Sequence, residues 1–428
     1  MMTRREQLKL LLLAASVPAV YAAARVLRGA GRGRSGRGGT PRRIQRYNIL
    51  GRTGLEVSDI GFGTSATADP QLLVDAFHRG VNYFDISPTY PWSVEMLAAA
   101  FSRDPEMRRG AIVASRVECA RYKDTMHCFG QMCGGPKLMP TACLGCIDEV
   151  LKKLGRSHID ILQRHGVGQG GEKEDMEWFD PNSPKGSGLL ALFETLKRQG
   201  KVRFTGMTTH GPYSLDEAFE RAVESGNFDT IMTALNFMQH PSPHFERSLQ
   251  AARERRIGIT AMKVLANAKA RNVGPMSGRP FSHAAIAWAL SRPGVNNVVI
   301  SISDWGMLDE YLGASGCELS LVDRVQLARH RAATSSRYCR VGCGLCRSRC
   351  PHGVDIPTIL RIDQYRSDYL LPDVAKEEYE AFPGRGRIQA CLECEDPACE
   401  AACPFGVPVR SRVRRAYAYL DPKGTLFS

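Results

Sequence analysis

Apolar and polar residues follow two alternating periods along the middle of the chain. Short, mostly apolar runs that are typical of buried strands are separated by segments with apolar residues at i, i+3 and i+4, which are typical of helices. The predicted strands span residues 58–63, 82–86, 111–116, 159–163, 202–206, 230–235, 259–264 and 297–302. The predicted helices span residues 72–78, 94–101, 143–154, 189–199, 215–225, 246–255 and 283–291.

This alternation predicts an α/β fold with eight strand–helix units, a (β/α)8 TIM barrel. A doubly wound open sheet has the same alternation and is the alternative. However, its phosphate-binding G-x-G-x-x-G does not follow the first predicted strand. The pattern therefore favours the barrel.

Polar residues gather where the predicted strands end. In a barrel of this kind the C-terminal ends of the strands carry the chemistry. The polar residues at these ends are Asp85, Tyr90, Arg116, His165, Thr208, Thr209, His210, Asn236 and Lys263. We therefore expect an active site at this mouth of the barrel.

The net charge of +13 is concentrated at the N-terminus. Residues 1–46 contain eleven Arg or Lys and one Glu, so this segment carries +10 and the rest of the chain +3. A nearly neutral body does not indicate a nucleic-acid surface. Residues 25–46 are rich in Arg and Gly but have no aromatic residue. We interpret them as a flexible, self-repelling linker rather than an RNA-binding tail.

Residues 1–24 have the pattern of an export signal. Arg4 and Arg5, with Leu8 and Lys9, precede an uncharged run from Leu10 to Ala24. That run is short for a membrane span and suits the apolar region of a signal peptide. The arginine pair resembles a twin-arginine signal. We expect export to the periplasm by that route. A cytoplasmic protein, or one tethered to the inner membrane by an uncleaved segment, is the alternative.

Several segments of the middle region resemble the aldo/keto reductase family. They are Asn48–Ser58 (NILGRTGLEVS), Phe84–Tyr90 (FDISPTY), Ile159–His165 (IDILQRH), Gly200–Gly206 (GKVRFTG) and Ala261–Leu265 (AMKVL). The resemblance extends over residues 47–330. A subgroup of this family carries a C-terminal ferredoxin-like extension, so the resemblance covers both halves of the chain. It implies redox chemistry on a small-molecule carbonyl or alcohol.

The resemblance also implies catalytic roles. In this family a tyrosine delivers a proton to a carbonyl while NADPH delivers a hydride, and the matching tyrosine is Tyr90. His165 matches the histidine that orients the substrate, and Asp85 matches the aspartate whose lysine partner lowers the tyrosine pKa. Arg116 stands at the lysine position. It supplies a cation that can pair with Asp85, but its planar fork is not geometrically equivalent to an ammonium.

The family's nucleotide-binding residues are matched less closely. Met232 replaces a glutamine that binds the nicotinamide, and a Thr pair replaces Ser-Asn after the fifth strand. Residues 301–310 (SISDWGMLDE) stand where the family has a Gly-rich, basic phosphate-binding stretch, and they include three acids and no cation. The residues expected to contact NADP(H), by position, are Thr208, Thr209, Asn236 and Lys263.

Eight of the fourteen cysteines form two runs near the C-terminus. The runs are Cys339-x3-Cys343-x2-Cys346-x3-Cys350-Pro351 and Cys391-x2-Cys394-x4-Cys399-x3-Cys403-Pro404. Each is similar to the ferredoxin pattern C-x2-C-x2-C-x3-C-P with one loop insertion. Residues 331–428 are therefore expected to form a mainly helical, ferredoxin-like iron–sulfur domain behind a barrel of residues 47–330.

In the ferredoxin pattern the fourth cysteine of each run binds the other cluster. This rule assigns one 4Fe–4S cluster to Cys339, Cys343, Cys346 and Cys403. It assigns a second to Cys391, Cys394, Cys399 and Cys350. Structural zinc is the alternative, because C-x2-C pairs also bind zinc. Zinc, however, has no need of a repeated Cys-x3-Cys-Pro.

Four further cysteines lie between the third and fourth predicted strands. They are Cys128, Cys133, Cys143 and Cys146. The last two are one helical turn apart and share a face. The set could bind a third metal, although burial as apolar residues is the commoner outcome.

Two functions remain open from the sequence. The first is an iron–sulfur oxidoreductase that couples carbonyl or alcohol redox at the barrel mouth to electron transfer with a redox partner protein. The second is a non-catalytic electron-transfer or binding protein on a degenerate barrel that no longer uses NADPH. Arg116, Met232 and the acidic residues 301–310 favour the second.

Overall fold

The computed structural model describes most of the chain from residue 42 onward. The described residues are 42–67, 69–88, 91–117, 119–122, 125–128, 131–133, 140–167, 177–209, 215–239, 243–265, 279–340, 343–367, 372–382, 384–396 and 398–421. The predicted export signal and the linker up to residue 41 lie outside them. The residues from Arg42 onward form one compact unit. None of the described helices is long and apolar enough to cross a membrane.

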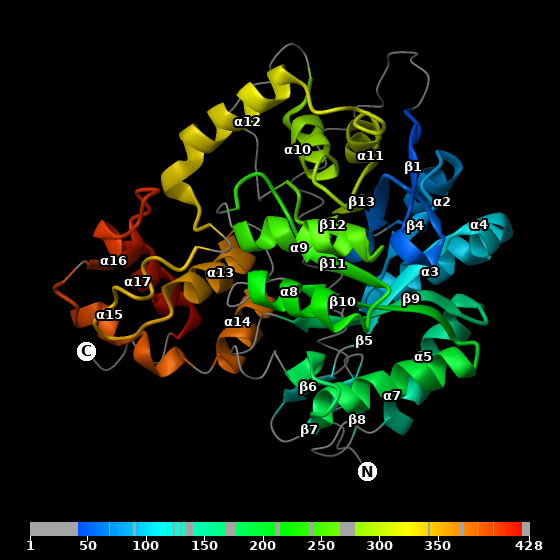
Figure 1. Ribbon diagram of the computed structural model, residues 1–428, viewed down its shortest axis with the longest axis horizontal. Helices are drawn as coiled ribbons and strands as arrows, with labels where there is room; N and C mark the ends of the chain where they lie inside the picture. The colour runs from blue at the N-terminus through cyan, green and yellow to red at the C-terminus, as the bar shows by residue number, and fades with distance from the viewer. Residues whose placement is uncertain are drawn as a thin grey trace, which may run out of the picture. The chain divides into compact units, whose positions relative to one another are not determined.

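Eight parallel strands close into a barrel (Figure 1). Each strand pairs in parallel with both of its neighbours. In chain order the strands are β3 (Ile60–Gly63), β4 (Tyr83–Asp85), β5 (Ile112–Val117), β9 (Ile159–Val167), β10 (Val202–Thr209), β11 (Thr230–Ala234), β12 (Gly258–Met262) and β13 (Val295–Ser301). The predicted (β/α)8 barrel is confirmed.

Helices follow the barrel strands and pack their apolar faces into a large cluster outside the barrel. Helix starts are fixed by side chains that accept a hydrogen bond from a free N–H of the first turn, as at Asp69, Asp104 and Ser183. The helices are α2 (Pro70–His78), α3 (Pro91–Arg103), α4 (Pro105–Gly110), α5 (Pro140–Leu154), α7 (Pro184–Arg198), α8 (Leu215–Ser225), α9 (Pro243–Glu254), α10 (Phe281–Leu290) and α11 (Trp305–Leu312).

An N-terminal hairpin fills one end of the barrel. It consists of β1 (Tyr47–Ile49) and β2 (Glu56–Ser58). Leu50, which follows β1, lies against Gly258 at the start of β12. It shares a buried apolar cluster with inward-facing residues of six barrel strands. The hairpin therefore closes the end where the strands begin, and the chemistry is left to the opposite end.

The observed strands differ from the predicted ones mainly at their C-terminal ends. β9 continues to Val167 and β10 to Thr209, so His165 and Thr208 lie within strands rather than after them. β12 ends at Met262, and Lys263 follows it in the left-handed region with φ 57°. The backbone of His165 and of Thr208 is thus held in place by the strand pairing of the barrel.

A small antiparallel sheet follows β5, in a region where the sequence predicts no strand. Its strands are β6 (Cys119–Tyr122), β7 (Thr125–Cys128) and β8 (Gln131–Cys133). The side chains of Cys128, Cys133 and Cys143 lie outside the described residues, so the third metal set stays a prediction. Cys146 is buried among apolar residues.

The C-terminal residues form a helical module with an apolar core of its own, coloured orange to red in Figure 1. α12 (Leu321–Thr334) leads into it. Within the module α13 packs against α14 and α17. The module helices are α13 (Ile356–Ser367), α14 (Pro372–Ala381), α15 (Ala390–Glu393), α16 (Ala398–Ala401) and α17 (Val409–Leu420).

Candidate functional site

A buried ion pair links β4 and β5 at the barrel mouth. Nη2 of Arg116 donates to Oδ2 of Asp85, and the two side chains are only 9% and 7% exposed. Burial raises the pKa of Asp85 to about 6, while the Arg116 guanidinium acts in the opposite direction. Arg116 also lies 3.5 Å from Sδ of Met232 on β11. The predicted pairing of Asp85 with Arg116 is therefore present, and it fixes the position of the cation.

His165 and Thr208 belong to the same inner face of the barrel. Side chains alternate between the two faces of a strand, and Ile161 on β9 is part of the inner cluster. Arg164 faces outward, with its guanidinium 4.2 Å from the ring centroid of Trp178. This alternation directs His165 inward. Both His165 and Thr208 are buried. β9, which carries His165, pairs with β5, which carries Arg116, whereas β10, which carries Thr208, pairs with β9 and β11.

Lys263 joins the barrel mouth to the C-terminal module. Its Nζ lies 3.2 Å from Oη of Tyr365 on α13 and 5.1 Å from the centroid of that ring. Burial lowers the pKa of Lys263 well below its usual value. The positive charges of Arg361 and Arg116 act in the same direction, and Glu378 opposes them. Lys263 therefore lies within electrostatic reach of both the barrel pair and the module.

Two residues expected to contact a nucleotide are engaged in local structure. Oγ1 of Thr209 donates to Oγ1 of Thr233 on the neighbouring strand at 2.9 Å. Oδ1 of Asn236 accepts from the backbone N–H of Met238 at 3.0 Å. Of the four expected residues, Lys263 is the one shown to interact electrostatically with Arg116 of the ion pair.

The segment after β13 does not fit a nucleotide phosphate. α11 begins at Trp305, and the Asp304 carboxylate accepts a hydrogen bond from the backbone N–H of Met307 at 2.9 Å. A helix N-terminus binds phosphate through free N–H groups and its positive dipole end. Here a carboxylate already takes up one of those groups and would repel a phosphate.

Tyr90, the predicted proton donor, lies outside the described residues, as does His210. The flanking elements are described, because β4 ends at Asp85 and α3 begins at Pro91. The role of Tyr90 stays a prediction from the family motif.

The eight cysteines of the two runs line two separate pockets in the module. One pocket takes three cysteines from the first run and one from the second, which we call the first cysteine set: Cys339, Cys343, Cys346 and Cys403. The other takes three from the second run and one from the first, the second cysteine set: Cys391, Cys394, Cys399 and Cys350. The runs thus exchange their fourth cysteines. None of the eight forms a disulfide.

Ionising these thiols is unfavourable in the protein alone. Burial raises the pKa of Cys339 and of Cys346 to about 12 and that of Cys391 to about 11, and neighbouring thiols of the same set add to each increase. Cationic iron held among the four sulfurs would offset this repulsion. Four thiols around one pocket are also the donor set that a 4Fe–4S cluster requires. The residues present therefore fit such a group.

Among the described residues, no group of three or more His, Cys, Asp or Glu side chains is placed to hold a single metal ion. One tetrahedral zinc draws its four sulfurs to within about 4 Å of one another, given Zn–S bonds of about 2.3 Å. Metal binding by the two cysteine sets therefore stays a prediction from their spacing and from the pockets that they line.

The module residues at the barrel mouth were not predicted from the sequence. Tyr365, Arg361 and Glu378 belong to helices of the C-terminal module, and Tyr365 lies 102 residues after Lys263 in the chain. Nothing in the barrel motifs points to them. The sequence predicted a mainly helical C-terminal domain but not which of its helices would contact the barrel.

The eight-stranded barrel, with a charged pair and a histidine at its mouth, places the chain in the class of (β/α)8 enzymes. Residues 59–267 match the aldo/keto reductase family. This match covers just under half of the chain, so the barrel is similar to that family, and relatives named as a dehydrogenase and an oxidoreductase support an oxidoreductase.

Two relatives and one solved structure illustrate the similarity. L-galactose dehydrogenase of Arabidopsis thaliana is 24% identical over 299 residues, which are 62% of this chain and 86% of the relative. The uncharacterized oxidoreductase YrpG of Bacillus subtilis (strain 168) is 26% identical over 242 residues, 51% of this chain and 66% of the relative. An aldo-keto reductase from Bacillus halodurans in its holo form superposes with a TM-score of 0.51 at 19% identity, covering 67% of this chain and 96% of that one. The structural likeness shows the fold alone.

The Asp85–Arg116 pair predicts an asymmetric response to substitution. Arg116→Met should lower the free energy of unfolding by about 3–5 kcal/mol, because it leaves the Asp85 carboxylate buried and unpaired. Adding Asp85→Leu should restore most of the loss, since two packed apolar side chains replace the pair. Denaturant unfolding of the full chain measures both variants. A double variant as unstable as the single one would show that Asp85 and Arg116 are not coupled.

The lowered pKa of Lys263 predicts a pH-dependent stability difference. In the pH range between the pKa of Lys263 in the folded protein and its usual value of 10.5, the unfolded chain binds more protons at Lys263 than the folded chain does. The free energy of unfolding of the wild type therefore increases as pH rises through this range. The stability of Lys263→Met relative to wild type should therefore fall between neutral pH and about pH 10. Lys376→Met, at an exposed lysine, controls for loss of a charge. A Lys263→Met difference that does not change with pH contradicts the burial of this amine.

Proposed function

We propose that this chain is an iron–sulfur oxidoreductase that couples carbonyl or alcohol redox at the barrel mouth to electron transfer through two 4Fe–4S clusters. The observation that carries the proposal is the exchange of cysteines between the two runs. Cys403 completes the pocket of the first run, and Cys350 completes the pocket of the second. A protein that used its cysteines as ordinary buried residues would have no reason to group them four to a pocket.

The first cysteine set would hold one cluster and the second set the other. When bound, the clusters supply one-electron transfer, which no side chain of the barrel mouth provides. The redox partner protein expected from the sequence would exchange electrons with this module. The sequence-based proposal of export by the twin-arginine route is consistent with these sites, since that route carries proteins already folded around their cofactors.

The barrel residues have separate roles in the proposal. Tyr90 delivers or takes the proton at the substrate oxygen, and the Arg116 cation held by Asp85 stabilises its phenolate. His165, on the inner face, orients the oxygen by a hydrogen bond. One relative is named a dehydrogenase of L-galactose, which supports a small carbonyl or alcohol substrate here.

NADP(H) has weaker support. Thr208 is buried on the inner face of the barrel and Lys263 interacts electrostatically with Arg116, but Asp304 accepts a hydrogen bond at the N-terminus of α11, where a phosphate would bind. In this proposal two electrons arrive one at a time through the cysteine module, Tyr90 supplies the proton at the substrate oxygen, and the proton at carbon comes from solvent.

The ligand sets predict the effect of single cysteine substitutions. Cys346→Ala and Cys391→Ala should each remove one cluster, so that iron and sulfide fall by about half and the visible absorption band falls with them. Cys317→Ala, at a cysteine outside both sets, is the matched control and should leave iron unchanged. Full iron content in both set variants would refute the assignment.

The barrel predicts a weak response to nucleotide. Dithionite should bleach the visible absorption of the anaerobic protein, whereas NADPH should neither bleach it nor bind tightly by calorimetry. Asp304→Ser keeps a helix cap and removes the carboxylate, so it should increase any residual NADPH affinity. Tight NADPH binding by the wild type would mean that the barrel receives hydride from a nucleotide and would overturn the proposed electron route.

A further inference from the structure

The two cysteine runs carry opposite charges between their ligands. From Cys339 to Cys350 the charged residues are Arg340, Arg347 and Arg349, with no acid. From residue 391 to residue 403 they are Glu393, Glu395, Asp396 and Glu400, with no base. Solubility does not explain this contrast, because acidic and basic side chains would keep the surface of the module equally soluble.

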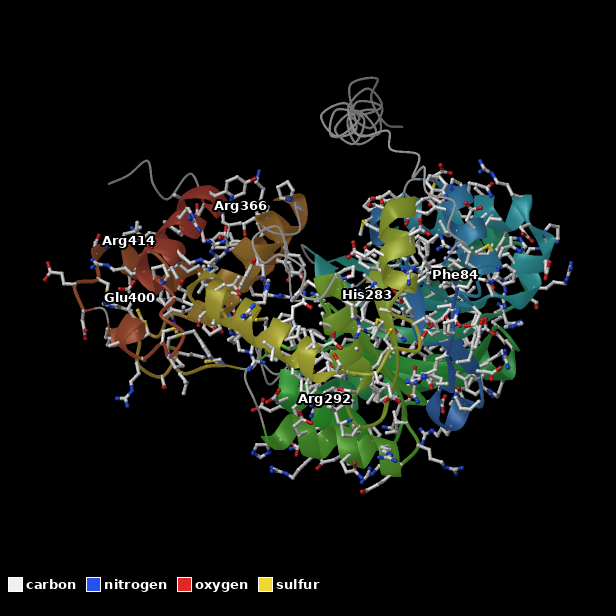
Figure 2. The ribbon with its side chains drawn as sticks, turned by 90° about the horizontal axis from the view of Figure 1, so that it is seen from above. Phe84, His283, Arg292, Arg366, Glu400 and Arg414 are labelled. Atoms are coloured by element: carbon white, nitrogen blue, oxygen red, sulfur yellow. The ribbon has the colours of Figure 1, made fainter. Side chains whose placement is uncertain are left out.

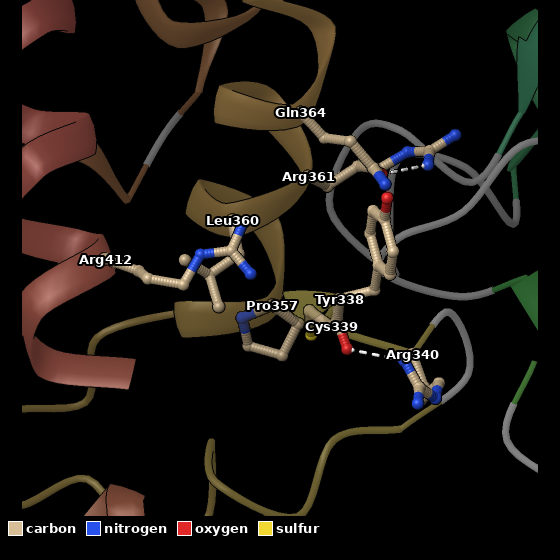
Figure 3. A pocket seen from close by; sticks show the side chains of 8 residues that line it. All are labelled: Tyr338, Cys339, Arg340, Pro357, Leu360, Arg361, Gln364 and Arg412. Atoms are coloured by element: carbon tan, nitrogen blue, oxygen red, sulfur yellow. Dashed lines mark hydrogen bonds between the residues drawn. The ribbon is translucent and has the colours of Figure 1, made fainter. Parts of the chain in front are cut away.

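The structure places two arginines directly at the first cysteine set. Arg340 lines its pocket, is 3% exposed, and stacks its guanidinium 4.7 Å from the ring centroid of Phe405. Arg412 of α17 lines an adjoining pocket together with Cys339. In Figure 3 its side chain extends from α17 toward Leu360 of α13. Both guanidiniums are therefore close to the sulfurs of this set.

The second set has acids beside its sulfurs. Asp396 lines the pocket, and its backbone oxygen accepts from Sγ of Cys394 at 3.1 Å. Glu400 follows Cys399 and accepts from the backbone N–H of Arg410 at 2.9 Å.

Two cations also lie near the second set and reduce the contrast. Arg410 lines the pocket, and Nε of Arg414 donates to the carbonyl oxygen of Cys391 at 2.9 Å. Figure 2 labels Glu400 and Arg414 in this part of the module. Around the second set the acidic and basic side chains thus offset each other. Around the first set the two arginines are not offset in this way, because no acidic residue lines its pocket.

One helix passes both sets and ends at the barrel. On α13, Ile356 lines the second pocket, Leu360 lines the first, and Tyr365 contacts Lys263. At 1.5 Å per residue these positions are about 6 Å and 7.5 Å apart along the helix axis. The first set is therefore the one nearer to the barrel mouth along this helix.

We propose that these charges give the site of the first cysteine set the higher reduction potential, so that electrons settle on the site nearer to the barrel. Reduction of a cluster adds one negative charge, which nearby guanidiniums stabilise and nearby carboxylates oppose. One electron leaves the second site, which is oxidised, and arrives at the first, which is reduced; no atom or proton moves. This inference rests on the proposed function, and it assigns a direction to the electron route.

The test is a potentiometric titration of the anaerobically purified full chain, followed by electron paramagnetic resonance. Two reduction steps are expected. Arg412→Gln should lower the potential of the step at higher potential and leave the other in place. Asp396→Asn and Glu400→Gln should raise the potential of the lower step. Arg340→Gln, at a buried arginine, should likewise lower the potential of the higher step. Arg324→Gln, at an exposed arginine of α12, is the control and should change the potential of neither step.

Iron and sulfide are counted in every sample, so the two proposals fail separately. Protein without iron and sulfide refutes the clusters themselves. With both clusters present, one unresolved step, or a change of the lower step by Arg412→Gln, overturns the order proposed here.

Discussion

The exchange of fourth cysteines between the two runs is the constraint on which the C-terminal module depends. Cys350 and Cys403 each leave their own run and complete the pocket of the other. This arrangement requires the two runs to lie side by side, and α13 and α17 pack against each other in the same module. Burial and neighbouring thiols raise the pKa of Cys339, Cys346 and Cys391, so a cation among the sulfurs would favour their ionisation.

α13 connects this constraint to the catalytic barrel. The helix contributes Leu360 to the first cysteine pocket and Tyr365 to the contact with Lys263. Lys263 in turn lies within electrostatic reach of Arg116, which is paired with Asp85. The residues of the aldo/keto reductase barrel and those of the cysteine module are therefore joined through one helix. This connection gives a physical reason for the two parts to occur in one chain.

The sequence predicted the regular and locally encoded features of this protein. Strand and helix periods predicted all eight barrel strands, and the cysteine spacing predicted which residues share each pocket. Asp85 and Arg116 were predicted to pair because a family motif places both at strand ends. These features depend on short-range patterns or on fixed spacings.

The remaining features depend on contacts that no local pattern encodes. Tyr365 reaches Lys263 only because the module packs at the barrel mouth, and the sequence around each residue is unrelated to the other. The sheet formed by β6, β7 and β8 lacks a long apolar run, so its strands had no period to detect. In the sequence Asp304 is one of three acidic residues between positions 301 and 310. Its role as the N-cap of α11 is visible only from the hydrogen bond that it accepts from the backbone N–H of Met307.

The central claim is that the two cysteine sets hold iron–sulfur clusters in an aldo/keto reductase-type enzyme. The most direct measurement is the iron, inorganic sulfide and zinc content of the full chain purified without oxygen. Two 4Fe–4S clusters predict about eight iron and about eight sulfide per chain. About two zinc per chain, with no sulfide, would contradict the account and return the cysteines to a structural role.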